Sequence, residues 1–172
     1  MPEFIPVLAR AEIEKSVAEI AAKISSDNHA KELTLIGALK GAFVFLSDLI
    51  RQLSIDVRID FVGVSSYGSE TSSSGKICLT KEIEIDIKGK HVLIIEDIVD
   101  TGLTLAYLIE HLKSFDPLSV KVCTLIDKRE RREADIDVAY ACHVVEEGFL
   151  VGYGLDYNEN YRNLPGIYHM KL

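Results

Sequence analysis

The most constraining feature of the sequence is the run Val92–Ile95, four aliphatic residues in succession that lead directly into carboxylates. A strand in which every residue is apolar has no face for solvent, so it must be buried on both faces. Such strands are typical of parallel sheets, whose crossover connections place helices on both sides. The run therefore predicts an α/β fold with a mostly parallel sheet.

The rest of the chain alternates between strand-like and helix-like segments, and apolar residues recur at helical spacing from Ile13 to Ile24. We expect helices at residues 10–25, 41–53 and 103–115, and strands at residues 32–39, 57–66, 76–85, 92–96, 119–127, 137–145 and 166–172. There is no internal repeat and no linker, so residues 1–172 are expected to form one domain. In such sheets ligands bind beyond the carboxyl ends of the strands.

The 172 residues carry a formal net charge of −8, and 48% of them are hydrophobic. That hydrophobic content suits a single domain with a buried core. The negative charge disfavours nonspecific nucleic-acid binding, which depends on Lys and Arg, so an anionic ligand must be held by local amides, a few cations or a metal ion. The first fifteen residues are charged early and lack a long apolar segment, so we expect no signal peptide and no membrane span.

The three cysteines, Cys78, Cys123 and Cys142, lie in apolar strand-like runs without metal-type spacing. A catalytic thiol is one interpretation, but the pattern favours reduced core thiols and a cytoplasmic protein. The five histidines show no metal-type pairing, so a structural zinc site is not expected.

The stretch VLIIEDIVDTGLTL ends the buried strand in Glu96, Asp97 and Asp100 and continues through Thr101 and Gly102 into a helix. The free amides at a helix start favour a phosphate, and glycine allows close approach. Carboxylates repel a phosphate, so they imply another task, such as binding ribose hydroxyls, coordinating Mg²⁺ or accepting a proton. The alternative is that they end the strand and cap the helix, but capping does not need three acids.

Two other phosphate-binding motifs are absent from the sequence. A Walker-type loop ends in Gly-Lys-Ser/Thr, and a dinucleotide fingerprint needs Gly-x-Gly-x-x-Gly. Gly152-Tyr153-Gly154 lacks the third glycine and the strand-to-helix context.

Five segments together resemble one known family. VLIIEDIVDTGLTL resembles the phosphoribosyl-diphosphate signature of type I phosphoribosyltransferases. GALKGAFVFLSDL, DFVGVSSYG, VKVCTLIDK and GFLVGYGLDYNENYRNLPGI are similar, in the right order, to signatures of hypoxanthine–guanine phosphoribosyltransferases. The resemblance implies the fold of that family, a mostly parallel twisted sheet flanked by helices, with a small hood formed by the N-terminal segment and roughly residues 145–172.

The resemblance also implies the contacts to phosphoribosyl diphosphate. Glu96 and Asp97 would bind the ribose hydroxyls, and the amides and hydroxyls of residues 100–104 would cradle the 5′-phosphate. Arg162 would grip pyrophosphate, as would a loop at Lys40 whose preceding peptide bond is often cis in that family; without the resemblance, Lys40 reads as a solvated charge at a helix start. The full set is Leu39, Lys40, Gly41, Ser66, Tyr67, Glu96, Asp97, Asp100, Thr101, Gly102, Leu103, Thr104 and Arg162.

Ser66 and Tyr67 open the polar segment SSYGSETSSSG. Such a segment is either an exposed connection or a lid. The pair matches the Ser-Tyr pair of the family's flexible loop, which implies a lid that excludes water during the reaction.

For the base, the resemblance implies that Lys128 donates to the 6-oxo group of a purine and that Asp100 is the general base near N7. Phe149 would stack on the base opposite Ile98, and Leu150 would bind it through the backbone, although from spacing alone Phe149 and Leu150 read as core residues. The residues implied for the purine are Ile98, Lys128, Phe149, Leu150 and Asp156. The residues implied for Mg²⁺ are Glu96, Asp97 and Asp156.

Taken together, the resemblance implies a Mg²⁺-dependent enzyme of purine salvage that transfers 5-phosphoribosyl from its 1-diphosphate to hypoxanthine or guanine and releases pyrophosphate. It further implies a homo-oligomer, a dimer or a tetramer. A regulatory protein on the same fold and an enzyme directed to xanthine or a pyrimidine remain open as alternatives. The net charge disfavours the first, and Lys128 disfavours a pyrimidine. The charged run KRERRE that begins at Lys128 receives no role beyond that lysine.

Overall fold

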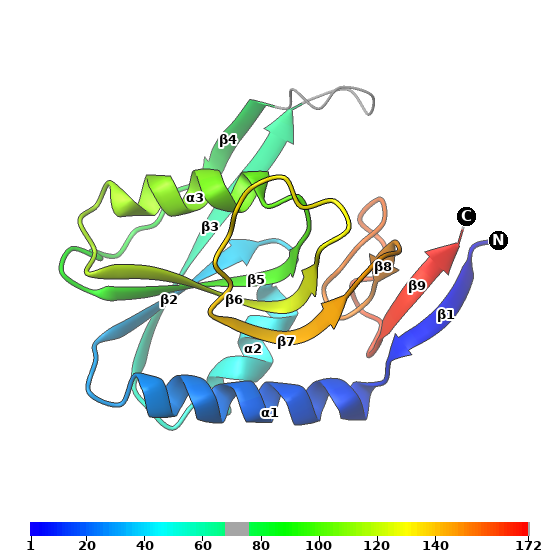
Figure 1. Ribbon diagram of the computed structural model, residues 1–172, viewed down its shortest axis with the longest axis horizontal. Coiled ribbons are helices and arrows are strands. Elements are labelled where there is room, and N and C mark those ends of the chain that lie inside the picture. The colour runs from blue at the N-terminus through cyan, green and yellow to red at the C-terminus, as the bar shows by residue number, and fades with distance from the viewer. Residues whose placement is uncertain (68–75, 172) are drawn as a thin grey trace.

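The computed structural model describes residues 1–67 and 76–171. Its main body is a six-stranded sheet in the order β4-β3-β2-β5-β6-β7 (Figure 1). The strands are β2 (Leu33–Leu39), β3 (Val57–Tyr67), β4 (Lys76–Lys81), β5 (His91–Val99), β6 (Ser119–Lys128) and β7 (Tyr140–Val145). Neighbouring strands are parallel except β3 and β4, which are antiparallel. The predicted mostly parallel sheet is therefore confirmed.

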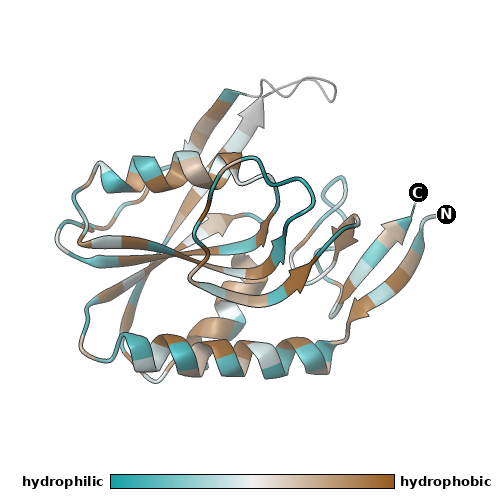
Figure 2. Ribbon diagram, viewed as in Figure 1, coloured by the Kyte–Doolittle hydropathy of each residue, from teal (hydrophilic) through white to brown (hydrophobic). Residues whose placement is uncertain are grey.

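Helices cover both faces of this sheet. They are α1 (Arg10–Asp27), α2 (Phe43–Ile50) and α3 (Leu103–Lys113). α1 and α2 lie on one side of the sheet and α3 lies on the other (Figure 1). Hydrophobic and hydrophilic residues alternate along α1 (Figure 2), as expected of a helix with one face toward the sheet and one toward solvent. Within residues 1–67 and 76–171, no helix is long and apolar enough to cross a membrane.

β5 carries the aliphatic run, and its side chains point alternately to the two faces of the sheet. Leu93 and Ile95 belong to the hydrophobic cluster that includes α1 and α2, whereas Val92 and Ile94 belong to the cluster that includes α3. Each of the four side chains is almost completely buried. Both faces of β5 are thus packed in a hydrophobic core. This packing fixes the register of the strand and the position of its carboxyl end.

The two ends of the chain form a second, three-stranded sheet in the order β1-β9-β8, which we call the hood. β1 (Glu3–Leu8) pairs antiparallel with β9 (Ile167–Lys171), so the termini lie side by side (Figure 1), and β8 (Leu150–Val151) pairs with β9 on its other edge. The sequence predicted β9 but neither β1 nor β8. β1 contains Pro6 and pairs only with a strand at the far end of the chain, and β8 is two residues long, so neither produces a local strand signal.

β4 ends at Lys81, whereas the sequence predicted a strand as far as residue 85. The backbone N–H groups of Glu84 and Ile85 instead donate to Oδ2 of Asp60, at 2.7 and 3.1 Å. Burial raises the pKa of Asp60, but these bonds and a third from Phe61 lower it overall. The carboxylate therefore takes donors that a longer strand would need for its ladder.

Replacing Ile94 with Ala should strongly destabilise the fold. The side chain is 0% exposed, and its loss leaves a cavity between β5 and α3, so we expect the free energy of unfolding to fall by about 2–5 kcal/mol. Leu118→Ala is the control, because Leu118 is 67% exposed and should change the value by only about 0.5 kcal/mol. Urea unfolding followed by circular dichroism measures both, and equal losses would contradict the role assigned to β5.

Candidate active site

The carboxyl ends of β2, β5 and β6 lie together, because the three strands are parallel neighbours. A cavity of about 310 Å³ opens at this edge, and we call it the strand-end cavity. Its wall brings together most of the residues predicted for phosphoribosyl diphosphate, from segments far apart in the sequence. Predicted residues in the wall are Leu39, Lys40, Gly41, Glu96, Asp97, Ile98, Asp100, Thr101, Gly102, Thr104, Asp156 and Arg162.

The loop after β5 turns into α3 at Gly102. This residue has a φ of 82°, a backbone angle that favours glycine, and a Cβ there would make a tight contact of 3.0 Å with Cγ1 of Ile136. The first N–H groups of α3 lie beside the cavity wall formed by Thr101 and Thr104. The hydroxyls of Thr101 and Thr104 therefore lie beside the free N–H groups of the helix N-terminus, and this arrangement suits a phosphate. Leu103 is not in the wall, and its side chain is exposed.

Glu96 and Asp97 adjoin each other at the end of β5, with their side chains only partly exposed. Burial, followed by the neighbouring charge of Asp97, raises the pKa of Glu96 well above its usual value. Burial also raises the pKa of Asp97, to about 6. Two adjacent carboxyl groups that hold a proton more readily than usual can present a donor and an acceptor together. This combination suits a pair of hydroxyl groups on a ligand.

The loop after β2 approaches this acidic pair closely. The peptide bond between Leu39 and Lys40 is cis, as the resemblance implied. At Gly41 an added Cβ would lie 1.7 Å from Oδ2 of Asp97, so only glycine leaves room for that carboxylate. The side chain of Lys40 is 68% exposed, and its Nζ donates to Oε2 of Glu159 at 2.8 Å.

Arg162 binds the same glutamate. Its Nη2 lies 3.1 Å from Oε1 of Glu159 and 3.2 Å from Oδ1 of Asp156, and its Nη1 donates to the carbonyl of Gly154 at 2.7 Å. The hydrogen bonds from Lys40 and Arg162 lower the pKa of Glu159. One carboxylate therefore pairs with both cations that were predicted to take pyrophosphate.

Asp100 and Lys128 lie beside each other although they follow different strands. Nζ of Lys128, on a side chain that is 8% exposed, is 3.9 Å from Oδ1 of Asp100 and 3.8 Å from Oε2 of Glu130. Oδ1 of Asp100 is buried and has no hydrogen-bond partner within the described part of the chain. An unpaired buried acceptor is unfavourable, so this oxygen is suited to accept a hydrogen bond from a ligand.

The other predicted base contacts are not all in the cavity wall. Ile98 lines the cavity, whereas Phe149 and Leu150 do not. Phe149 is 48% exposed and packs edge-on against Tyr157 with ring centroids 5.6 Å apart, so it is not a core residue. Leu150 is buried in the main hydrophobic cluster, so the core interpretation holds for its side chain.

The predicted lid falls largely outside the described residues. Ser66 and Tyr67 are the last residues of β3, and residues 68–75 are not described. The lid hypothesis therefore stays a prediction.

The carboxylates predicted for Mg²⁺ line one cavity without forming a cage. Glu96, Asp97 and Asp156 are all in its wall, yet no group of three or more His, Cys, Asp or Glu side chains in the described ranges lies close enough to hold a metal alone. Mg²⁺ prefers oxygen ligands and is usually held by one or two carboxylates, water and substrate phosphates. The residues present therefore fit an ion that is shared with a phosphorylated ligand.

Glu159 and Arg132 are among the residues that contact the predicted site without having been predicted from the sequence. Glu159 pairs with Lys40 and Arg162, and Arg132 donates from Nε to the carbonyl of Asp100 at 2.9 Å. Both stand among other charged or polar residues in the sequence. Only the three-dimensional contacts distinguish them from a solvated charge.

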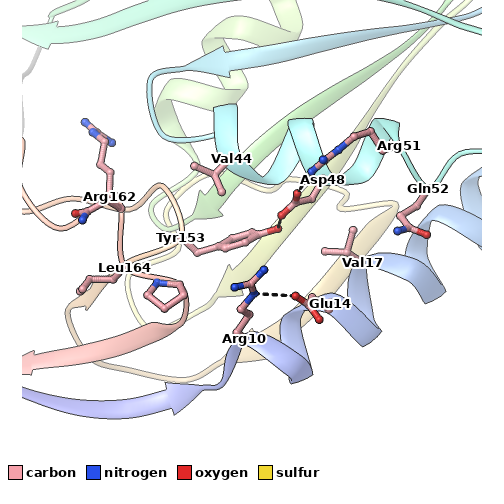
Figure 3. Close-up of a pocket in the computed structure, with 12 residues that line it drawn as sticks. Arg10, Glu14, Val17, Val44, Asp48, Arg51, Gln52, Tyr153, Arg162 and Leu164 are labelled. Carbon is pink, nitrogen blue, oxygen red and sulfur yellow. Dashed lines mark hydrogen bonds and ion pairs between the residues drawn. The ribbon is translucent and has the colours of Figure 1, made fainter.

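A larger cavity, of about 530 Å³, lies between α1, α2 and the loop that precedes β9 (Figure 3). In its wall the hydroxyl of Tyr153 donates to Asp48, and Nε of Arg10 lies 2.8 Å from Oε1 of Glu14. Among the predicted site residues in the described ranges, Arg162 alone is in this wall, and it also lines the strand-end cavity. The sequence predicts no role for this second cavity.

A family model described as "Phosphoribosyl transferase domain" matches residues 7–158. Together with the parallel sheet and the strand-end cavity, this match defines the class of the protein as phosphoribosyltransferase. A hypoxanthine-guanine phosphoribosyltransferase of Bacillus subtilis (strain 168) is 44% identical over 161 residues, which cover 94% of this chain and 89% of that protein.

Solved structures similar to this chain belong to the same class of protein. A crystal structure of a hypoxanthine-guanine phosphoribosyltransferase from Bacillus anthracis, with a HEPES molecule in the active site, has a TM-score of 0.92 and 40% identity and covers 100% of both chains. A hypoxanthine phosphoribosyltransferase from Staphylococcus aureus has a TM-score of 0.92 and 42% identity and covers 96% of this chain and 90% of that one. The chain belongs to the hypoxanthine-guanine phosphoribosyltransferase family.

Gly41→Ala should weaken the binding of phosphoribosyl diphosphate. The new methyl group would overlap Asp97, so either the carboxylate or the loop must move, and we expect affinity to fall by about tenfold or more, which is about 1.4 kcal/mol. Gly89→Ala is the control, because Gly89 lies outside the cavity wall and nothing lies within 4 Å of the added carbon; its φ of 69° makes the substitution strain the backbone, which should lower stability rather than this affinity. Isothermal titration measures both affinities, and unchanged binding by Gly41→Ala would remove this loop from the site.

Proposed function

We propose that this protein transfers the 5-phosphoribosyl group from 5-phosphoribosyl 1-diphosphate to N9 of hypoxanthine or guanine, giving IMP or GMP and pyrophosphate. The observation that carries the proposal is the pairing of Asp100 and Lys128 beside the strand-end cavity. One supplies a buried acceptor without a partner and the other a cation 3.9 Å away. A 6-oxopurine offers the complement, an N7–H donor next to an oxygen acceptor.

The loop at residues 100–104 is the proposed site of the 5′-phosphate. A protein with a net charge of −8 cannot attract a phosphate by its overall field, so the attraction must be local. The start of α3 and the hydroxyls of Thr101 and Thr104 supply it. Glu96 and Asp97 adjoin this loop and take the ribose hydroxyls, since their raised pKa values let one carboxyl group donate while the other accepts.

Lys128 and Asp100 are proposed to read the base. Lys128 donates to the 6-oxo oxygen, and Asp100 accepts the N7 proton and acts as the general base. Adenine carries an amino group at position 6 and cannot accept from Lys128, and an unpaired buried group costs about 1–3 kcal/mol. The half-exposed ring of Phe149 is available to stack on the base.

Lys40 and Arg162 are proposed to hold the pyrophosphate. Both now pair with Glu159, so pyrophosphate must replace a carboxylate that already satisfies them. Arg162 can offer a phosphate two parallel hydrogen bonds. Mg²⁺, held by Asp156 and the pair Glu96 and Asp97, would supply positive charge to the leaving pyrophosphate when bound.

Two further parts of the proposal concern the assembly and its environment. We place the protein in the cytoplasm, because Cys78, Cys123 and Cys142 are all free thiols. We also propose a homo-oligomer, a dimer or tetramer, as the family resemblance implies.

The proposed reaction is tested by pyrophosphate release from phosphoribosyl diphosphate in the presence of Mg²⁺, with hypoxanthine, guanine, xanthine, adenine and uracil offered separately. We expect release with hypoxanthine or guanine and none with adenine or uracil. Silence with all five bases, from folded protein that binds phosphoribosyl diphosphate, would favour a regulatory protein on this fold.

Asp100→Asn should lower kcat for IMP synthesis by about 10²–10⁴, because an amide cannot take the N7 proton. Asn keeps the shape of the side chain, so the thermal midpoint should stay close to that of the parent. Steady-state kinetics at saturating hypoxanthine checks the rate. Near-normal turnover would remove Asp100 from the general-base role.

Glu159→Gln should strengthen the binding of pyrophosphate. The amide has no charge to hold Lys40 and Arg162, so the competing partner is weakened while both cations remain. We expect the dissociation constant to fall by about threefold to tenfold, the size expected of exposed ion pairs worth up to about 1 kcal/mol. Glu147→Gln, elsewhere on the surface, is the control, and weaker binding by Glu159→Gln would show that Glu159 instead holds the cations in their working positions.

A further inference from the structure

Arg132 lies in the charged run after Lys128 that the sequence left without a role. Its Nε donates to the carbonyl of Asp100 at 2.9 Å, and its Nη2 lies 3.1 Å from the carbonyls of both Val99 and Lys128. The same nitrogen donates to Oδ1 of Asp127. One guanidinium group thus bonds to the last residues of β5 and of β6 together.

These contacts are buried and directional. The side chain of Arg132 is 20% exposed and that of Asp127 is 5% exposed, so the pair is largely shielded from solvent. The planar fork of Arg can bridge several acceptors at fixed angles, which the single ammonium group of Lys cannot do. The backbone carbonyls that Arg132 joins belong to Asp100 and Lys128, whose side chains are 3.9 Å apart.

We propose that Arg132 is a positioning residue that sets the distance and angle between Asp100 and Lys128 across the purine. The inference rests on the proposed function and adds to it the residue that aligns the general base with the base-reading lysine. Parallel pairing places the ends of β5 and β6 next to each other, but at Asp100 the chain has left the ladder, and Arg132 ties it back to Lys128.

The phosphate side of the loop has anchors of its own. The N–H groups of Glu133 and Ala134 donate to the carbonyl of Thr101, at 2.9 and 3.0 Å. These backbone bonds do not need the side chain of Arg132. Its loss should therefore misplace Asp100 and Lys128 while leaving the binding of phosphoribosyl diphosphate nearly unchanged.

A neighbouring arginine provides a matched control. Arg129 pairs with the other oxygen of Asp127, its Nε and Nη2 being 3.2 and 3.1 Å from Oδ2, and its side chain is 60% exposed. Its recorded hydrogen bonds within the described ranges do not include the carbonyls of Val99, Asp100 or Lys128. It also keeps Asp127 paired when Arg132 is replaced, which favours a folded variant.

The experiment compares Arg132→Gln, Arg132→Lys, Arg129→Gln and Asp127→Asn. For both Arg132 variants we expect kcat at saturating substrates to fall by about 10- to 100-fold, the cost of a small misalignment of catalytic groups, with KM for phosphoribosyl diphosphate changed by less than about threefold. Lysine should not rescue kcat, because it cannot bridge the carbonyls. Arg129→Gln and Asp127→Asn, which keep those bonds, should retain kcat within about threefold.

Thermal unfolding and calorimetric binding of phosphoribosyl diphosphate show whether each variant is folded. If Asp127→Asn loses as much kcat as Arg132→Gln, the ion pair and not the carbonyl bonds is what matters, and the inference is wrong. The inference would also be wrong if the parent protein is active and Arg132→Gln is equally active. Failure of the proposed function can be distinguished from failure of this inference, because in the first case the parent protein itself would release no pyrophosphate with any purine.

Discussion

Burial of β5 on both of its faces is the constraint on which the rest of the structure depends. Val92 and Ile94 pack toward α3, and Leu93 and Ile95 pack toward α1 and α2, so no residue of this run can carry polar chemistry. The polar side chains of Glu96 and Asp97 come only after this run, and Ile98 and Val99 return to the two cores before β5 ends. The parallel neighbours β2 and β6 leave the cores at the same edge. Hydrophobic packing therefore determines where the cavity lies.

The charges at that edge solve a problem that the composition creates. Under the proposed function, a chain with a net charge of −8 holds a polyanion beside several of its own carboxylates. At that edge Lys40 and Arg162 are both paired with Glu159. If pyrophosphate binds these two cations as proposed, it replaces one anion, Glu159, with another of higher charge.

How much of this could be predicted from the sequence depends on where the signal lies. The double-sided strand and the loop at Thr101 and Gly102 produce local patterns, and the structure has both where they were expected. β1 and β8 produce none, because their stability comes from pairing with β9 at a distance in the sequence. The cis bond before Lys40 was implied by family resemblance alone, since no composition rule predicts it.

The residues that sequence reasoning missed share a physical property, since they act through other residues. Many of the predicted ligand-binding residues, such as Asp100 and Thr101, stand between a strand end and a helix start, where the backbone itself marks the place. Glu159 and Arg132 stand in loops, and their partners lie on other elements, at Lys40 and at Val99 and Asp100. A charged residue in a loop has the same local sequence pattern whether it is solvated or positions another residue of the site. The precision of this site thus comes from contacts between loops, added to a position that the sheet has already set.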